Sequence, residues 1–429
     1  MEVYTDKTIN ILFKENKLEL ILKFFQNKIK LGEKINQSFF NRLLIGLEKN
    51  QDYETLLTSY SHASDNSCIS IHEQTITIVI RTYLEINNLH DAFLTLTKLD
   101  ESQIKKRTLI LFFNYYYLNG KVDEIYEFYI SNLKGKFVLN NEDYNKLLNV
   151  IFINNRKDLY FKLIGNIQGK KIIFEYPINT NFSINGCYLN QKNQCSNCNN
   201  KIKRINLSIS ERKILLSNLK NSYLTSDTDK ELFKKFVKFV KNINNIKIVI
   251  DGGNILYFGD RKINFNSYHK LNLIIKKVLK KYDPKHVLLI IHNRHKTFIK
   301  KNFNSGVSQK IEDILKEWET KIKVYYTPFN MNDDWFIVYA GIIYHNSLII
   351  SNDLMKDHKF KIGQEIDFED LFSKWVEISR IEFNFKNKKY NFNNTELSFP
   401  NSFSMRVQKN GDHYHIPSIN GKWVCVHNI

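Results

Sequence analysis

The sequence predicts a multidomain protein in which an α-solenoid precedes a Rossmann-like α/β domain with a parallel sheet, with a small metal-binding domain between them. Three observations support this fold class. Polar breaks recur about every 35 residues in the first 165 residues, a Cys-x-x-Cys pair follows, and strand-like and helix-like segments then alternate. We place the domains at 1–165, 166–245 and 246–395, with residues 396–429 completing the metal-binding domain.

Length and composition restrict the class of protein. A chain of 429 residues is long enough for two or three domains, each with its own core. Its 43% hydrophobic and 25% charged residues indicate a globular chain rather than a disordered one. The 63 basic residues against 44 acidic ones give a net charge of +19, which favours a polyanionic partner. A biased composition that only solvates the surface is the alternative.

Targeting signals are not evident in the sequence. There is no run of about 18 apolar residues that would span a membrane. The first twenty residues carry four acidic side chains, which is untypical of signal and transit peptides. We therefore expect the nucleus or cytoplasm. A reduced compartment also fits the cysteines, which are too few and too unevenly spaced for a disulfide framework: Cys68, Cys187, Cys195, Cys198 and Cys425.

The first 165 residues contain a repeat. Polar breaks lie 34, 37, 32 and 35 residues apart, at Asn16, Asn50, Asn87, Asn119-Gly120 and Asn154. Apolar segments with helical periodicity precede the later breaks: Phe39–Leu47, Thr75–Ile86, Thr108–Leu118 and Tyr144–Ile153. Two helices per repeat of this length predict an α-solenoid, in which each unit buries its apolar face against its neighbours.

Two repeat families have nearly this period. The segment Gly120–Tyr129 resembles part of a pentatricopeptide repeat, which is an RNA-binding module. The Trp, Gly and Ala signature of tetratricopeptide repeats is absent from the sequence. A helical scaffold that binds proteins remains the alternative.

The Cys195–Cys198 pair has the spacing of a zinc knuckle, but a structural zinc site needs four ligands. The remaining candidates are Cys425 and either His413 or His415, so the C-terminal segment would fold back beside the pair. A redox pair or simple buried thiols are the alternatives. We expect the other two cysteines, Cys68 and Cys187, to be core residues.

The segment after this pair alternates between helices and strands. Ser208 and Glu211 have the spacing of a capping box, which predicts a helix from there toward Leu219. A second helix, Asp229–Lys241, carries a core stripe of Phe233, Phe236 and Phe239. Strands are then predicted at Ile246–Ile250, Val287–Ile291, Lys323–Tyr326 and Leu348–Ile350, and helices at Ser267–Lys281, Ser308–Thr320 and Asp334–Tyr344. This alternation predicts a parallel sheet.

Four aspartates are placed to meet at one edge of that sheet. Asp251 and Asp353 follow strands, and Asp333-Asp334 open a helix. Open α/β sheets gather their sites at the carboxyl ends of the strands, so these acids would share one crevice. Carboxylates suit Mg²⁺, which activates water in phosphoryl chemistry. Each acid alone would also serve as a helix cap or surface charge. Neither GxGxxG nor GxxxxGK[ST] is present, so a nucleotide cofactor is unsupported.

Several of these motifs together resemble protein-only RNase P, a family that joins pentatricopeptide repeats to an NYN/PIN-type metallonuclease domain. The motifs are Val249-Ile-Asp-Gly-Gly-Asn-Ile255, Asn332-Asp-Asp-Trp-Phe-Ile-Val-Tyr-Ala340, Ile350-Ser-Asn-Asp-Leu-Met-Lys-Asp-His358, the Cys195–Cys198 pair, and His415-Ile-Pro with Trp423-Val-Cys425. Their order and spacing agree over essentially the whole chain. Gly253 stands where the family usually has Ala.

The resemblance implies roles for individual residues. Asp251, Asp333, Asp334 and Asp353 match the catalytic aspartates that bind Mg²⁺ or Mn²⁺. Asp357 and His358 match further catalytic-site positions, either directly behind the metal-binding residues or near the substrate. The split zinc site of the family falls on Cys195, Cys198, His415 and Cys425, with His413 as an alternative to His415.

The resemblance also implies an activity. This would be ribonuclease P, an endonuclease that hydrolyses one phosphodiester bond to remove the 5′ leader of precursor tRNA and leaves a mature 5′-phosphate. The protein would act without an RNA subunit. Another endoribonuclease with the same domains, acting on other structured RNA, and a non-catalytic tRNA-binding protein are the alternatives.

Overall fold

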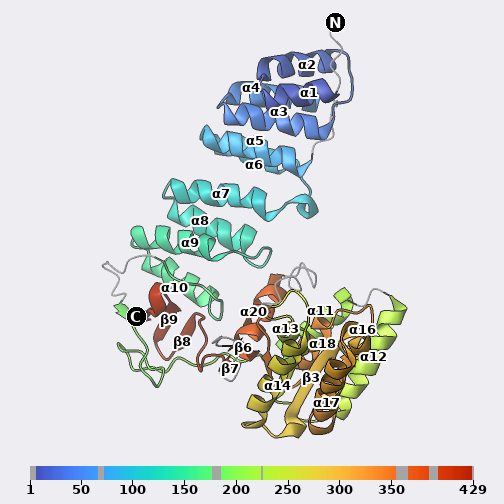
Figure 1. The fold of residues 1–429 in the computed structure, drawn as a ribbon. Coiled ribbons are helices and arrows are strands. Elements are labelled where there is room, and N and C mark those ends of the chain that lie inside the picture. The colour runs from blue at the N-terminus through green and yellow to red at the C-terminus, as the bar shows by residue number, and fades with distance from the viewer. Residues whose placement is uncertain are drawn as a thin grey trace. The chain divides into compact units, whose positions relative to one another are not determined.

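A computed structural model describes residues 6–65, 72–175, 185–223, 226–353, 366–385 and 395–427 (Figure 1). Cys68, Asp357 and His358 lie outside the described residues. The chain forms two compact units, Met1–Leu163 and Ile164–Ile429, which divide close to the first predicted domain boundary. Within the described ranges, no helix has both the length and the apolar character needed to cross a membrane.

The first unit consists of successive helix pairs. A residue with positive φ lies in the turn inside each pair, and each of these residues is at or next to a predicted break: Asn16, Gln51, Asn87, Gly120 and Asn155. The helices are α1 (Asp6–Lys14), α2 (Leu18–Lys30), α3 (Gln37–Lys49), α4 (Tyr53–Asp65), α5 (Glu73–Glu85), α6 (Leu89–Leu96), η1 (Glu101–Gln103), α7 (Lys106–Leu118), α8 (Val122–Phe128), η2 (Tyr129–Leu133), α9 (Asn141–Ile153) and α10 (Lys157–Asn166). The predicted solenoid is confirmed.

Polar contacts between neighbouring repeats join residues that are one period apart. The Thr77 and Thr108 hydroxyls lie 2.8 Å apart, and Arg81 donates to Glu48 at 3.0 Å. Glu73 at the start of α5 is 7% exposed and accepts hydrogen bonds from Arg107 and Thr108 of α7. The two residues of each pair are 31 to 35 residues apart, close to the period of the polar breaks. Equivalent positions of neighbouring repeats therefore contact each other.

We expect the Glu73 contacts to make the stability of this unit depend on pH. Burial disfavours the charged carboxylate, but hydrogen bonds from Arg107, Thr108 and Thr77 outweigh burial and lower the pKa of Glu73 from 4.5 to about 2. The ionised form therefore contributes about 3 kcal/mol above pH 4.5, and this contribution disappears as the pH falls toward 2. Glu73→Gln should lower the melting temperature at pH 7 and much less at pH 2.5. Glu54→Gln, at an exposed position on α4, is the control; equal losses for both variants would contradict the assignment.

The second unit contains a six-stranded sheet in the order β4-β3-β2-β5-β6-β7. Its strands are β2 (Ile248–Asp251), β3 (Val287–His292), β4 (Lys323–Thr327), β5 (Leu348–Ile350), β6 (Arg380–Phe385) and β7 (Thr395–Ser398). The first four, β2 to β5, are the predicted strands, and they are parallel as expected. Strands β6 and β7 were not predicted from the sequence, and β6 is parallel to β5. Strand β7 is antiparallel and continues the sheet past residue 395, where we had ended the domain.

Helices cover both faces of this sheet (Figure 1). Side chains of β2 alternate between two cores: Val249 packs with one face, and Ile248 and Ile250 with the other. The first core contains residues of α11 (Ile209–Tyr223), α12 (Asp227–Asn242), α18 (Asp334–Ile343) and α20 (Ile366–Ser379). The second contains residues of α13 (Gly252–Leu256), α14 (Phe265–Leu279), α16 (Ile299–Asn302) and α17 (Ser305–Lys321). Short helices η3 (Pro284–His286) and α15 (Arg294–Thr297) flank β3.

Helices α11 and α12 belong to the core of the large sheet, although the predicted boundaries place them in the metal-binding domain. The Phe236 ring lies 4.9 Å from the ring of Phe336 in α18, and Phe233 is 2% exposed. The predicted capping box is present at the start of α11, where Ser208 N donates to Glu211 and Glu211 N donates to Ser208 Oγ. These helices therefore belong to the helical layer of the large sheet rather than to the small domain.

A second, four-stranded antiparallel sheet has the order β1-β10-β9-β8. It combines β1 (Asn185–Cys187), which precedes the large sheet in sequence, with β8 (Gln408–Asn410), β9 (His413–Pro417), η4 (Ile419–Gly421) and β10 (Trp423–His427), which follow it. Arg406 is fully buried and forms ion pairs of 2.9 Å with Asp370 and Glu377 of α20. This arginine fixes the small sheet to the layer of helices around the large one.

Helix α18 packs closely against β5 and α20 at Gly341. A β-carbon added at Gly341 would overlap the Ile349 side chain and lie 2.9 Å from Trp375 Cζ2, and both of these side chains are buried. We expect Gly341→Ala to lower the free energy of unfolding by about 1–3 kcal/mol. Gly306→Ala in α17 is the matched control, because no atom lies within 4 Å of its β-carbon position. Chemical denaturation of both variants tests this; an unchanged Gly341→Ala protein would contradict it.

Candidate functional site

The predicted acidic residues lie at the point where the order of the large sheet reverses. Strand β2 pairs with β3 on one side and with β5 on the other, and ligands bind beyond the carboxyl ends of the strands at such a switch point. Asp251 is the last residue of β2, and Asp353 follows β5 by three residues. Asp333 and Asp334 stand at the N-terminus of α18.

A hydrogen-bond network holds Asp251, whose side chain is buried. Its Oδ1 accepts from the backbone N–H of Asn254 at 2.9 Å, and its Oδ2 accepts from Ser351 Oγ at 2.7 Å. Ser351 Oγ in turn accepts from the backbone N–H of Asp353 at 3.1 Å. The backbone N–H of Asn352 donates to Asn254 Oδ1 at 2.9 Å. The ends of β2 and β5 are therefore linked through these side chains. The backbone of Asp353 takes part in this link, but Asp353 does not line the cavity that the other three aspartates share.

Asp333 lies next to this network. A β-carbon at Gly253 would be 2.6 Å from Asp333 Oδ2 and 3.8 Å from Asp251 Oδ1. The three aspartates Asp251, Asp333 and Asp334 line one cavity of about 330 Å³, together with Gly253, Asn254, Tyr257, Phe258, Arg294 and Asn352. An alanine at this position would require the end of the Asp333 side chain to shift.

The acids in this cavity disfavour one another's ionisation. Burial raises the pKa of Asp251 to about 8, with smaller contributions from Asp333 and Asp334, while its two hydrogen bonds act in the opposite direction. Burial and the neighbouring Asp334 also raise the pKa of Asp333. A divalent cation would supply the missing positive charge and displace the proton. The oxygen donors fit a hard cation such as Mg²⁺.

A second group of predicted residues forms a tight cluster at the small sheet. One ligand atom from each of Cys195, Cys198, His415 and Cys425 lies within 4.8 Å of the other three. Cys198 Sγ is 3.2 Å from His415 Nε2. Strands β9 and β10 place His415 directly opposite Cys425, and a tight turn with Asn199 N donating to Cys195 O brings the pair Cys195–Cys198 to them. Three thiols and one imidazole are a usual donor set for a tetrahedral metal.

The surroundings of this cluster also fit a metal. Burial, with a smaller effect of His413, lowers the pKa of His415 to about 4, so the imidazole is neutral and able to bind. A hydrogen bond with Cys187 and burial raise the pKa of Cys425. Cys187 is itself 2% exposed and belongs to the core around the cluster, as expected for a core residue. His413 is outside the cluster, and its ring lies 4.6 Å from that of His427.

The two sites differ in compactness. Among the residues that the structure describes, the cysteine and histidine cluster is the one group of three or more potential ligands placed around a single point. The aspartates instead surround a wider cavity. Uncompensated carboxylates repel one another, and Mg²⁺ keeps several of its waters and contacts few carboxylates directly, so a wider arrangement suits it.

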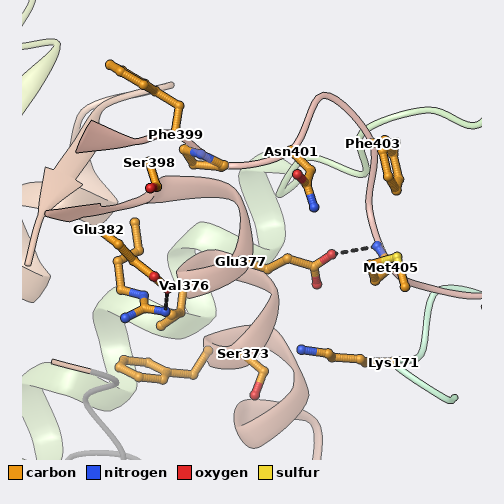
Figure 2. A pocket seen from close by; sticks show the side chains of 13 residues that line it. Lys171, Ser373, Val376, Glu377, Glu382, Ser398, Phe399, Asn401, Phe403 and Met405 are labelled. Atoms are coloured by element: carbon orange, nitrogen blue, oxygen red, sulfur yellow. Dashed lines mark hydrogen bonds and ion pairs between the residues drawn. The ribbon is translucent and has the colours of Figure 1, made fainter. Parts of the chain in front are cut away.

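A larger cavity of about 510 Å³ in the same unit does not offer free acids (Figure 2). Its carboxylates are already engaged. Glu377 accepts from the backbone N–H of Met405 at 2.8 Å and from Arg406, and Glu382 pairs with Arg380. We therefore take the smaller cavity, lined by Asp251, Asp333 and Asp334, as the candidate catalytic site.

The first unit has a basic and aromatic hollow of about 860 Å³ between α1, α2 and α3. The Arg42 guanidinium lies 4.1 Å from the Phe13 ring centroid, and Lys28 lies 5.2 Å from that of Phe24. Phe39 contacts both rings edge-on, at 5.7 and 5.6 Å. Cations beside aromatic faces are typical of surfaces that bind unpaired bases and phosphates.

Several residues that line the acidic cavity were not predicted from the sequence, above all Arg294. This residue follows β3, the strand next to β2, and lines the cavity beside the acids. Sites gather at the carboxyl ends of parallel strands, and this rule applies to basic as well as acidic residues, so the position of Arg294 after β3 was a signal for it. Ser351, Asn254 and Asn352 were part of the quoted motifs but had no assigned role.

The fold and the two sites define a class of protein: a helical-repeat protein joined to a Rossmann-like domain, with an acidic cavity and a cluster of three cysteines and one histidine. A sequence model described as "Protein-only RNase P" matches residues 189–425, more than half of the chain. The chain belongs to the protein-only RNase P family.

Relatives in Arabidopsis thaliana are distant and longer. Proteinaceous RNase P 3 is 25% identical over 204 residues, which cover 45% of this chain and 33% of that protein. Proteinaceous RNase P 1, chloroplastic/mitochondrial, is 22% identical over 245 residues, which cover 55% of this chain and 40% of that protein. The matched segment thus spans well under half of these relatives. The crystal structure of nuclear proteinaceous RNase P 2 from A. thaliana has a TM-score of 0.64, with 16% identity and 97% of both chains covered, which shows the fold.

Loss of one cluster ligand should release the metal. We expect Cys425→Ser to reduce the metal content of the purified protein from about one ion at this cluster to a small fraction of that, and to lower the melting temperature by roughly 10 °C or more, because the small sheet depends on the ion. Elemental analysis and thermal unfolding measure the two effects. His413→Ala, two residues from His415, should keep the ion. Retention of the ion in Cys425→Ser, or its loss in His413→Ala, would show that the ligand set is wrong.

Proposed function

We propose that this protein is a ribonuclease P that removes the 5′ leader of precursor tRNA by a metal-dependent endonucleolytic cut. The observation that carries the proposal is the acidic cavity at the switch point of the sheet, in a chain that belongs to the protein-only RNase P family. The net charge of +19 supports an RNA substrate.

Asp251, Asp333, Asp334 and Asp353 would hold one or two Mg²⁺ or Mn²⁺ ions. A divalent ion bound there would lower the pKa of water and offset the charge that develops on the leaving oxygen. Water oxygen adds to phosphorus, the bond from phosphorus to the leader's 3′ oxygen breaks, and a proton ends on that oxygen. The products are a 5′-phosphate on the tRNA and a 3′-hydroxyl on the leader.

The hydrogen bonds around Asp251 would position the acids for this reaction. Ser351 and Asn254 fix both oxygens of the Asp251 carboxylate, so its orientation does not depend on the cation. Arg294 lies beside the acids and would bind a phosphate oxygen of the substrate. Asp357 and His358, outside the described residues, are proposed to lie near the substrate on the resemblance alone.

The helical unit would bind the body of the tRNA. Unpaired nucleotides of a structured RNA are recognised by stacking and by contacts to phosphates, and the hollow between α1 and α3 offers aromatic rings beside Arg42 and lysines. We also propose that the cysteine and histidine cluster holds Zn²⁺ as a structural ion, because three thiolates and an imidazole favour it over harder cations. The protein would need no RNA subunit.

Replacement of two acids should abolish cleavage. We expect Asp333→Asn with Asp334→Asn to lower the single-turnover rate by more than about 100-fold, since even residues outside the ligand shell change activity by 10–100-fold. The substrate is a precursor tRNA with a leader of several nucleotides, in Mg²⁺. Asp313→Asn, at an exposed position on α17, should cleave as the parent does.

The same assay separates the alternative functions. A single cut at the leader junction that EDTA prevents supports ribonuclease P. Many cuts in unstructured RNA would indicate an endonuclease of other specificity. Tight, salt-sensitive binding without any cut would indicate a tRNA-binding protein, and the catalytic roles of the aspartates would then be wrong.

A further inference from the structure

Two exposed phenylalanines lie side by side on the loops that follow β3 and β4. Phe298 is 43% exposed and Phe329 is 42% exposed, although both are large apolar side chains. Their ring centroids are 5.7 Å apart, and the ring planes meet at 41°. We call this pair the Phe298–Phe329 platform.

The platform is anchored to buried histidines rather than held loosely. The Phe329 ring lies 5.9 Å from the ring of His292, which is 6% exposed, and His292 lies 6.2 Å from His295. Phe298 sits between the short helices α15 and α16, and the next residue, Ile299, is buried in the sheet core. The two rings are therefore presented in a defined place.

Arg294 connects the platform with the acidic cavity. Its backbone N–H donates to His292 Nδ1 at 3.0 Å, and its Nε donates to His295 Nε2 at 3.3 Å. Arg294 also lines the cavity with Asp333 and Asp334. A chain of contacts thus links the cavity to the platform. Arg294 lines the cavity and contacts His292 and His295, and the His292 ring contacts the Phe329 ring.

The segment that carries Phe298 is basic. The Lys301 ammonium lies 6.0 Å from the Phe298 ring centroid. Lys296 and Lys300 pair with Glu319 at 2.6 Å and with Glu312 at 3.6 Å. Ion pairs between exposed groups contribute little and are exchanged readily, so phosphates can replace these carboxylates. Aromatic faces among cations are typical of grooves for single-stranded nucleic acid.

We infer that the Phe298–Phe329 platform stacks the base of an unpaired leader nucleotide next to the cleaved bond, while Arg294 binds the phosphate between that base and the acids. The inference rests on the proposed function, since it assumes a precursor tRNA in the cavity. The leader is the favoured occupant because stacking requires a free base face, whereas the bases of the acceptor stem are paired. The platform would hold the scissile bond in register with the aspartates.

The test asks whether the effect of removing each phenylalanine ring depends on the presence of the leader base. Cleavage of a precursor tRNA is compared with cleavage of the same precursor whose leader nucleotides next to the junction are abasic. We expect Phe298→Ala and Phe329→Ala to lower kcat/KM on the normal precursor by about 5- to 100-fold, the range for loss of one stacked base. On the abasic precursor neither variant should differ from the parent. A ring with only a structural role would lower both rates equally.

Phe399→Ala is the matched control. Phe399 is 41% exposed and has the Lys281 ammonium 4.2 Å from its ring centroid, but it lines the larger cavity and not the acidic one (Figure 2). This variant should cleave both precursors as the parent does. Thermal unfolding of the three variants should match the parent within about 2 °C, because substitutions at exposed positions change stability little.

Binding provides a readout that does not need cleavage. A precursor with 2-aminopurine at the leader position next to the junction should lose fluorescence on binding to the parent protein and keep it with Phe298→Ala or Phe329→Ala. No quenching by the parent, or equal quenching by the variants, would overturn the inference. Equal kcat/KM of the phenylalanine variants and the parent on the normal precursor would also overturn the inference. The exposed rings would then be a contact surface for a partner protein instead. If the parent quenches but does not cut, the proposed activity fails while the platform stands.

Discussion

Burial of the Asp251 carboxylate at the end of a central strand is the constraint on which this structure depends. Strand β2 is covered on both faces, so its last side chain is only 2% exposed. A lone carboxylate in such a place is expensive to ionise unless partners compensate it. The chain supplies Ser351 and the backbone of Asn254 as donors but adds further acids nearby. Hydrogen bonds therefore fix the geometry and leave the charge for a cation to balance.

The neighbouring elements are arranged around that carboxylate. Asn254 and Asn352 tie the turn after β2 to the chain after β5, and Asn352 also contacts β6 through two hydrogen bonds with Phe383. Gly253 leaves room for the Asp333 carboxylate at the start of α18. Gly341 lets the same helix approach β5 closely. Small residues thus set the distances between the acids, because a side chain at either glycine would push α18 or its aspartate away.

The small sheet follows a different principle. The core on the cysteine side of this sheet is small and consists of Cys187, Cys195, Ile202, Trp423 and Cys425. A metal ion held by Cys195, Cys198, His415 and Cys425 would strengthen this core and would join segments more than 200 residues apart in sequence. Arg406 then fastens this sheet to α20 through two buried ion pairs.

The sequence by itself determined the features that local patterns encode. The breaks near Asn16, Asn50, Asn87, Gly120 and Asn154 predicted the helix pairs, because turns with positive φ select Asn and Gly. Runs of branched apolar residues predicted β2, β3 and β5, since strands buried on both faces need them. The aspartates at the strand ends and the Cys195–Cys198 pair were also predicted, because they form short local motifs.

Only the tertiary structure decided which distant residues meet. The pairing of β9 with β10 sets His415, not His413, opposite Cys425, and no local pattern distinguishes two histidines with the same alternation. Helix α12 joined the large sheet because its phenylalanine stripe packs on the aromatic face of α18, and α11 joined the same core through Leu215 and Leu219. Arg294, Phe298 and Phe329 lie on two separate loops, and their neighbourhood exists only once β3 and β4 are side by side. Sequence periodicity reports which face a residue is on, whereas strand order and register determine its neighbours.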